Sequence, residues 1–393
     1  MKAIKLLRFY LLFFPLLFGV QAHCASITPS AFLSWAEANY GTYFPTPSSD
    51  YPLPGYVVRY YPSRSNYLGV KDDGKVYVYG ADTGNQLLAL GSLSDFTCRV
   101  SPTSCPPTTG VVRVVLFTHI EDNTPVGTLG SDTARTNYLL WRSRLVTMAQ
   151  LAKRYSFTWV LQPDWKFLEA ALLYEDTTAM ASTGGVNLLR YLRDSLGVVI
   201  DPHSHEAGGY NYSDVAYLLN RLGVGGATVI GGHVWDPALP QFAHWERFRV
   251  PVAGTRYPTF TWRGDILMGH GTPNHTNDPI TSGVWRPKEP NDFFTDDPTA
   301  NIVAVGGYKG DIAGIAELVS KYKTAQVDAN CLLTSTYHIT PTTLSSTAGL
   351  TGLEQDVLVP LQAYRSRGEI EITDFTSLVS NWRSQYGASA CVR

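Results

Sequence analysis

The pattern of apolar residues changes along the chain, and from residue 111 onward it alternates between two periods. Short runs rich in β-branched residues, typical of buried strands, alternate with longer stretches whose apolar residues recur at helical spacing. This order predicts an α/β fold, a (β/α) barrel, with a doubly wound open sheet as the alternative. Strands are predicted at 111–118, 157–161, 198–200, 227–230, 302–305, 331–338 and 369–372. Helices are predicted at 136–155, 186–196, 213–222 (with Ser213 as N-cap), 311–322, 353–367 and 374–386.

Residues 27–100 show a different pattern and predict a small α+β domain. Apolar positions in 29–40 have helical spacing, and three short strands follow. The segment 101–110 is rich in Pro, Thr and Ser and predicts a linker, so that 111–393 forms a separate domain. The three strands are predicted at 56–61, 66–70 and 75–79.

Three segments of the small domain carry a resemblance. They are Trp-Ala-Glu at 35–37, Arg-Tyr-Tyr-Pro at 59–62 and Tyr-Leu-Gly-Val at 67–70. In these segments the domain resembles a module found at the N-terminus of various secreted bacterial proteins. The resemblance implies no particular function, and a binding or spacer role is the default expectation.

The first 22 residues have the order of a secretory signal peptide. Lys2, Lys5 and Arg8 precede an apolar run over 11–20, and small residues follow it. The run is too short for a membrane span, and no later stretch is long and apolar enough to cross a bilayer. We therefore expect a secreted or periplasmic protein without a membrane span in its mature chain.

Charge and composition narrow the class of partner. The chain has 31 basic and 33 acidic residues, and removal of the first 22 leaves 28 basic residues, a net charge of −5. This balance argues against nucleic acid or an anionic membrane surface as the main partner. Charged residues make up only 16%, and 23 tyrosines and 9 tryptophans suit either carbohydrate contact or a large core.

The five cysteines predict disulfides in an oxidising compartment. Cys98 with Cys105 and Cys331 with Cys391 are the expected pairs, which leaves Cys24 over. Spacing alone does not determine this connectivity.

Two histidines directly follow the predicted strand 198–200, within the segment Asp-Pro-His-Ser-His-Glu at 201–206. Side chains at i and i+2 of an extended segment point to the same side, so His203 and His205 can reach one metal ion. Neutral imidazole is a common ligand of zinc and similar metals, and catalytic groups of barrel folds collect at the C-terminal ends of strands. A polar loop without metal is the alternative.

Two further strand ends carry candidate chemistry. His119, Glu121 and Asp122 follow strand 111–118, and His338 ends strand 331–338. Adjacent carboxylates are costly to bury unless metal binding or proton transfer uses them, and the alternative is a solvated acidic turn. His119 is expected either to support the metal ligands or to pack in the core. A lone histidine such as His338 is often structural.

These three strand-end motifs resemble the polysaccharide deacetylase superfamily, the NodB-homology domains, over about 110–393. Members are partial (β/α) barrels that remove acetyl groups from N-acetylated sugars with a divalent metal. The resemblance implies Glu121 as base and His338 as acid. It implies Asp122, His203 and His205 as metal ligands.

The chain departs from the family pattern at three points. Glu121 stands where the family has Asp, and the two histidines are closer together than usual. For the arginine of the family's middle motif, Arg286 is the best candidate. The chain is therefore expected to be a divergent member.

The stretch 231–298 is too long for a plain connection and is predicted to be functional surface. Its segment 269–275 could line a substrate cleft, and loop scaffolding is the alternative for its other polar residues. Its candidate substrate-binding residues are His233, Trp235, His270 and Trp285, and His233 is also the best candidate for an additional ligand.

Together these features predict a secreted, metal-dependent hydrolase, with zinc as the expected ion, that removes acetyl groups from an N- or O-acetylated carbohydrate. A metal-free glycoside hydrolase that uses Glu121 and Glu206 is one alternative. A carbohydrate-binding surface protein with an inactive barrel is the other.

Overall fold

The computed structural model describes residues 27–93, 96, 100, 110–233, 245–270 and 279–392. The chain divides into two compact units, 1–108 and 109–393, and the division falls inside the segment predicted as a linker. The predicted signal peptide and both Cys98 and Cys105 lie outside the described residues. Within the described part of the chain, no helix combines the length and the apolar character that a bilayer span requires.

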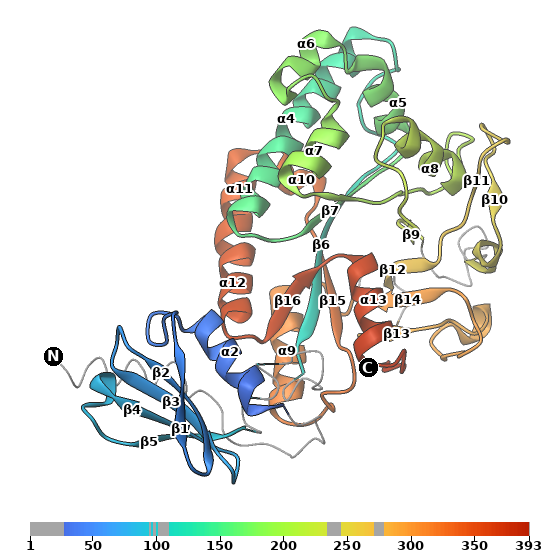
Figure 1. Ribbon diagram of the computed structural model, residues 1–393. Helices are drawn as coiled ribbons and strands as arrows, with labels where there is room; N and C mark the ends of the chain where they lie inside the picture. Colours follow the sequence, from blue (N-terminus) through green and yellow to red (C-terminus); the bar gives the residue numbers. More distant parts are fainter. Residues whose placement is uncertain are drawn as a thin grey trace. The chain divides into compact units, whose positions relative to one another are not determined.

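The described part of the N-terminal unit contains helix α2 and an antiparallel sheet whose strands are ordered as they follow in sequence (Figure 1). The helix begins after Thr28, whose hydroxyl accepts the N–H of Ala31, and Pro29 occupies its first turn. Phe32 and Leu33 of the helix pack on Leu68 and other apolar residues of one sheet face. The elements are α2 (Pro29–Asn39), β1 (Ser49–Leu53), β2 (Tyr56–Tyr61), β3 (Asn66–Lys71), β4 (Lys75–Gly80) and β5 (Leu88–Ser92).

In the C-terminal unit, the first sheet is parallel and is centred on β6 (Val112–Ile120). Strand β6 pairs with β7 (Trp159–Pro163), β15 (Thr334–His338) and β16 (Ile370–Thr373). Strand β8 (Val199–Ile200) pairs with β7 at the edge of the sheet. Val114 and Leu116 pack on one face of this sheet and Val115 and Phe117 on the other. Burial on both faces explains why β6 has a nearly continuous apolar sequence.

The second sheet contains three parallel strands and one antiparallel edge strand. In order they are β13 (Val284–Trp285), β14 (Val303–Gly306), β12 (Ile266–His270) and β9 (Val229–Ile230). A separate hairpin consists of β10 (Val252–Ala253) and β11 (Thr261–Trp262).

The two sheets of the C-terminal unit are linked at both ends and share a core. His203 and Gly231 form a parallel bridge between β8 and β9, and the N–H of Thr336 donates to the carbonyl of Gly307 at 3.1 Å. Val115 and Phe117 of the first sheet pack with Ile266 and other apolar residues of the second. The unit is thus a mixed α/β fold built around parallel strands.

Helices of the C-terminal unit follow most parallel strands, and most begin at a polar N-cap. Helix α8 begins at Tyr212, and its N-cap is Asn211, whose side chain accepts the N–H of Asp214. The prediction of Ser213 as the N-cap was wrong, because the hydroxyl of Ser213 donates to the carbonyl of Val252. The longer helices are α4 (Asp132–Arg154), α5 (Trp165–Tyr174), α7 (Leu188–Leu196), α8 (Tyr212–Arg221), α9 (Ile312–Lys323), α12 (Val359–Ser366) and α13 (Phe375–Gln385). The short ones are α6 (Thr177–Met180), α10 (Pro341–Leu344), α11 (Thr347–Leu353) and the π-helical turn η6 (Glu354–Leu358).

Cys331 and Cys391 form a disulfide, which confirms this predicted pair. It joins residues 60 positions apart in sequence and attaches the C-terminal segment beside the start of β15.

Candidate metal centre

Parallel strands of the first sheet bring three histidines together at their C-terminal ends. His119 lies near the end of β6, His338 ends β15, and His203 follows β8. The ring centroids of His119 and His203 are 4.3 Å apart, and those of His119 and His338 are 5.0 Å apart. The carboxyl ends of parallel strands meet at one edge of a sheet, which is why residues from 119 to 338 converge here.

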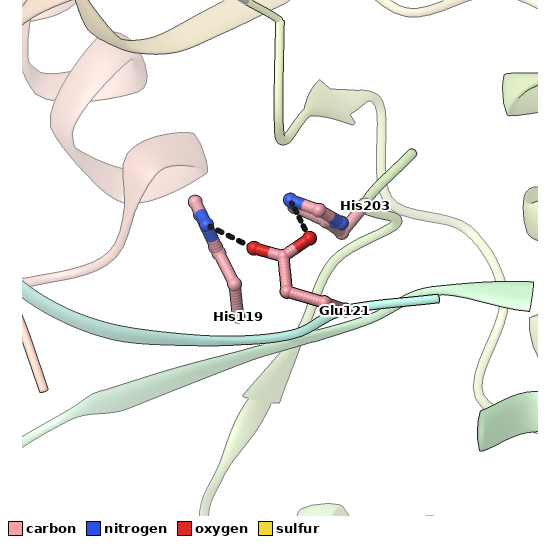
Figure 2. A group of neighbouring side chains, drawn as sticks. All are labelled: His119, Glu121 and His203. Atoms are coloured by element: carbon pink, nitrogen blue, oxygen red, sulfur yellow. Dashed lines mark ion pairs between the residues drawn. The ribbon is translucent and has the colours of Figure 1, made fainter. Parts of the chain in front are cut away.

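Glu121 places its carboxylate among these imidazoles. Oε1 is 3.8 Å from Nδ1 of His119, and Oε2 is 3.7 Å from Nε2 of His203, as Figure 2 shows. Nε2 of His205 lies 3.3 Å from the same Oε2. One donor atom each from His119, Glu121 and His203 lie within 4.8 Å of one another, and we call these three residues the candidate metal centre.

His203 is fully buried, and a second carboxylate lies behind its ring. Oδ2 of Asp164 is 3.5 Å from Nδ1 of His203, while the Asp164 side chain also caps helix α5 by accepting the N–H of Trp165. Among the described residues, neither ring nitrogen of His203 has a hydrogen-bond partner. Buried polar atoms without partners are costly, and a carboxylate behind an imidazole is the usual support of a histidine ligand.

Burial and mutual repulsion keep two of the imidazoles neutral. Burial lowers the pKa of His119 well below its usual value, and the charges of His203 and His338 lower it further. Burial also lowers the pKa of His338, against the opposing effect of Glu121. Neutral imidazole is the form that binds a metal ion or accepts a proton.

Glu121 and His205 shift each other's pKa in opposite directions. Burial acts to raise the pKa of Glu121, but the hydrogen bond from His205 and the charges of His203 and His205 outweigh it, and the pKa is lowered. The same hydrogen bond raises the pKa of His205. Glu121 is therefore an ionised acceptor, and His205 carries a proton at higher pH than an ordinary histidine.

These residues fit a divalent metal of the zinc type. Two imidazoles and one carboxylate are a donor set of catalytic zinc sites, which keep a further position open. The buried nitrogens of His203, which have no hydrogen-bond partner among the described residues, are the structural observation that favours such a group.

The ligand set favoured by the geometry differs from the predicted one. Because β6 extends to Ile120, His119 and Glu121 lie on the same face of the strand, two positions apart. Asp122 lies outside the candidate metal centre, and its charge contributes to the raised pKa of His205. His203 belongs to both sets, whereas His205 contacts Glu121 rather than standing among the three donors. Side chains at i and i+2 of an extended segment point to the same side, and this holds for His119 and Glu121 as it does for His203 and His205.

Trp285 and Arg286 are two further site residues that the sequence predicts. Trp285 is fully buried, and its indole N–H donates to the carbonyl of Phe293, so it packs in the core. Arg286 forms a two-pronged ion pair with Asp296 and lies over the Trp382 ring. These contacts engage both side chains with residues outside the candidate metal centre.

The remaining candidates come from the stretch 231–298. His233 is buried two residues after Gly231, the bridge partner of His203. His270 ends β12, and only its backbone is described. Trp235 lies outside the described residues.

Asp164 was missed by the sequence analysis, although a signal existed. Gln162-Pro163-Asp164 directly follows the predicted strand 157–161, so it is another polar strand end. The helix after it, α5, was not predicted either, and an Asp before an apolar helical stretch is a typical N-cap.

No family model, curated protein or solved structure matches this chain. The resemblance to the polysaccharide deacetylases therefore stays a prediction, and the function is inferred below from the residues of the site.

Replacing Asp164 by asparagine is expected to lower zinc affinity about 10–100-fold while leaving helix α5 capped. The asparagine oxygen can still accept the N–H of Trp165, but its amide donates toward Nδ1 of His203, which places the ring proton on Nε2. Nε2 is the nitrogen that faces Glu121. Zinc titration by calorimetry measures the change.

Asp176→Asn is the matched control, because Asp176 caps the short helix α6 in the same way and lies among exposed residues. Equal zinc affinity of the Asp164→Asn variant and the wild type would show that this carboxylate does not support the ligand.

Proposed function

We propose that the chain is a secreted, metal-dependent hydrolase that removes acetyl groups from an N- or O-acetylated carbohydrate. The observation that carries this proposal is the convergence of His119, Glu121 and His203 at one edge of the parallel sheet, with His205 and His338 beside them. A solvated acidic turn does not explain a fully buried histidine whose ring nitrogens lack hydrogen-bond partners among the described residues.

We infer that the two sheets form an incomplete (β/α) barrel. The His203–Gly231 bridge joins β8 to β9, the Thr336–Gly307 hydrogen bond joins β15 to the loop after β14, and the inward residues of both sheets share one core. In such a barrel the candidate metal centre lies at the C-terminal end, where catalytic groups are found.

The residues that would hold the metal are His119, Glu121 and His203, with Asp164 orienting His203. When bound, an ion of the zinc type polarises a carbonyl group and lowers the pKa of a water molecule. The chain's own contribution is to keep the imidazole of His119 neutral, to present an ionised carboxylate and to exclude solvent from His203.

His205 and His338 are suited to the proton transfers of acyl hydrolysis. Because its lowered pKa keeps His338 neutral, its imidazole can accept a proton from the attacking water. The raised pKa of His205 keeps that imidazole protonated to higher pH, so it can donate a proton to the departing amine or alcohol. This assignment differs from the predicted one, in which Glu121 is the base and His338 the acid. Glu121 is engaged with three imidazoles, which favours a ligand role over a free base.

The test is acetate release from acetylated chitooligosaccharides and acetylated xylan by the mature protein. We expect release with zinc, loss after treatment with a chelator, and recovery when zinc is added back. Cleavage of glycosidic bonds that survives the chelator would instead favour a carboxylate-only glycoside hydrolase. The ion pair between Glu206 and Arg247 argues against that alternative, because it engages one of the two carboxylates required.

A further inference from the structure

Among the described residues, one face of the N-terminal sheet carries no helix, and tyrosines are concentrated on that face. Helix α2 packs on the face that carries Leu68 and Val78. On the opposite face, the strand register places Tyr60, Tyr67 and Tyr79 side by side across β2, β3 and β4. The rings of Tyr60 and Tyr67 are stacked with centroids 4.6 Å apart.

The centre of this tyrosine face is hollow. The neighbouring row of the register runs from Tyr51 through Val58 and Gly69 to Tyr77, so its two central positions carry small side chains. A Cβ atom at Gly69 would lie 2.9 Å from Cγ2 of Val58, which makes glycine the residue that fits. The resulting cavity has a volume of about 300 Å³, and we call it the tyrosine hollow. It is lined by Tyr51, Leu53, Tyr56, Val58, Tyr67, Gly69, Tyr77, Tyr79 and Leu87.

The rim of the hollow is exposed although it is aromatic and aliphatic. Tyr51 and Leu53 are each 44% exposed, Tyr79 is 41% exposed and Leu87 is 60% exposed. A contiguous exposed patch of this kind marks an interaction surface more often than a core, and tyrosines provide rigid contact area at low entropic cost.

The chemistry of the lining selects among possible occupants. No charged residue lines the hollow, so an anionic ligand would lose its hydration without gaining a cation. Among the described residues, the hydroxyl groups of its tyrosines form no hydrogen bond with the protein. A second apolar surface would bury these hydroxyls without partners, whereas a sugar offers both apolar C–H faces to the rings and hydroxyls to the phenols.

We propose that the tyrosine hollow binds a neutral glycan. The hollow lies in the N-terminal unit, so binding there does not depend on the metal centre of the C-terminal unit. Strand addition would use the sheet edges β1 and β5 rather than this face, and nucleic acid would require basic residues that the lining lacks.

The experiment measures depletion of the full mature protein by insoluble chitin and cellulose, and retardation in gels that contain neutral xyloglucan or anionic alginate. We expect binding to at least one neutral glycan and none to alginate. Replacing Tyr51 and Tyr79 together by alanine is expected to lower the association constant about tenfold or more, and replacing both by phenylalanine about threefold.

Val57→Ala is the matched control, because Val57 is 41% exposed in the same sheet but points to the opposite face from Val58. The alanine pair is expected to leave the zinc content of the protein unchanged, because the two tyrosines lie in the N-terminal unit and the candidate metal centre lies in the C-terminal unit. Unfolding midpoints confirm that each variant is folded, and the phenylalanine pair keeps the ring packing if the alanine pair does not fold.

Three results would overturn the proposal. They are retention by none of the neutral glycans, equal retention of the wild type and the folded tyrosine variants, and a wild-type dimer in light scattering that the variants lose while no glycan binds. The last result would assign the hollow to contact between two copies of the chain.

Discussion

Replacing His203 by alanine is expected to remove the metal ion and to abolish hydrolysis. His203 is the fully buried member of the candidate metal centre, and Nε2 faces the Glu121 carboxylate at 3.7 Å. Loss of residues that only support a ligand costs about 10–100-fold in affinity, so loss of a ligand itself is expected to cost at least about 100-fold. Elemental analysis after dialysis and zinc titration against a competing chelator measure this change.

His233→Ala is the comparison variant, because the sequence predicts His233 as an additional ligand whereas the three donors do not include it. His233 is also a buried histidine near a strand end, but it lies outside the three donors, so its variant should retain the ion. If the wild type takes up no metal after reconstitution, or if His203→Ala binds it as tightly, the candidate metal centre is refuted. Loss of the ion in His203→Ala without any acetate release by the wild type would leave the metal centre standing and reject the proposed substrate class.

The free energy of unfolding of the metal-free Asp201→Asn variant, compared with that of the wild type, is expected to increase as the pH rises from acidic to neutral. Asp201 lies at the end of β8 and is 1% exposed. Burial raises its pKa from 3.8 to about 7, the charge of Asp374 adds to the rise, and Gln162 partly offsets it. The folded protein therefore binds this proton more tightly than the unfolded chain, and the stability that it contributes below about pH 4 is lost as the pH rises through 7.

The size of the effect follows from the shift. A rise of about three pKa units corresponds to roughly 4 kcal/mol, and asparagine does not titrate. The free energy of unfolding of Asp201→Asn, minus that of the wild type, should thus increase by about 4 kcal/mol between pH 4 and pH 8. Urea unfolding at a series of pH values, with chelator in every sample, measures this difference.

Asp374→Asn provides the internal control, because asparagine can still cap helix α13 while the charge near Asp201 is removed. In the Asp374→Asn background, the pH-dependent change in the free energy of unfolding caused by Asp201→Asn should be smaller, because part of the rise in the pKa of Asp201 comes from Asp374. A stability difference that stays flat from pH 4 to pH 8 would show that Asp201 is not buried as a neutral acid.

Local patterns in the sequence determined the class of each unit and the strand ends that carry chemistry. Apolar runs are short and β-branched where strands are buried on both faces, as in β6, and the helical stripes between them predicted the α/β order. The pairs His203–His205 and Glu121–Asp122 were noticed because polar residues directly after buried strands are unusual. These signals involve neighbours along the chain, so sequence alone carries them.

Tertiary structure decided which of these residues meet. His119 and Glu121 lie on one face of β6, Asp122 lies outside the three donors, and Asp164 reaches His203 from β7, about 40 positions earlier in the sequence. Spacing along the chain predicts which residues follow a strand, but the pairing of β6, β7, β8 and β15 sets the distances between their ends. The same reason separates the predicted Trp285 and Arg286 from the site, because their buried contacts are with Phe293, Asp296 and Trp382.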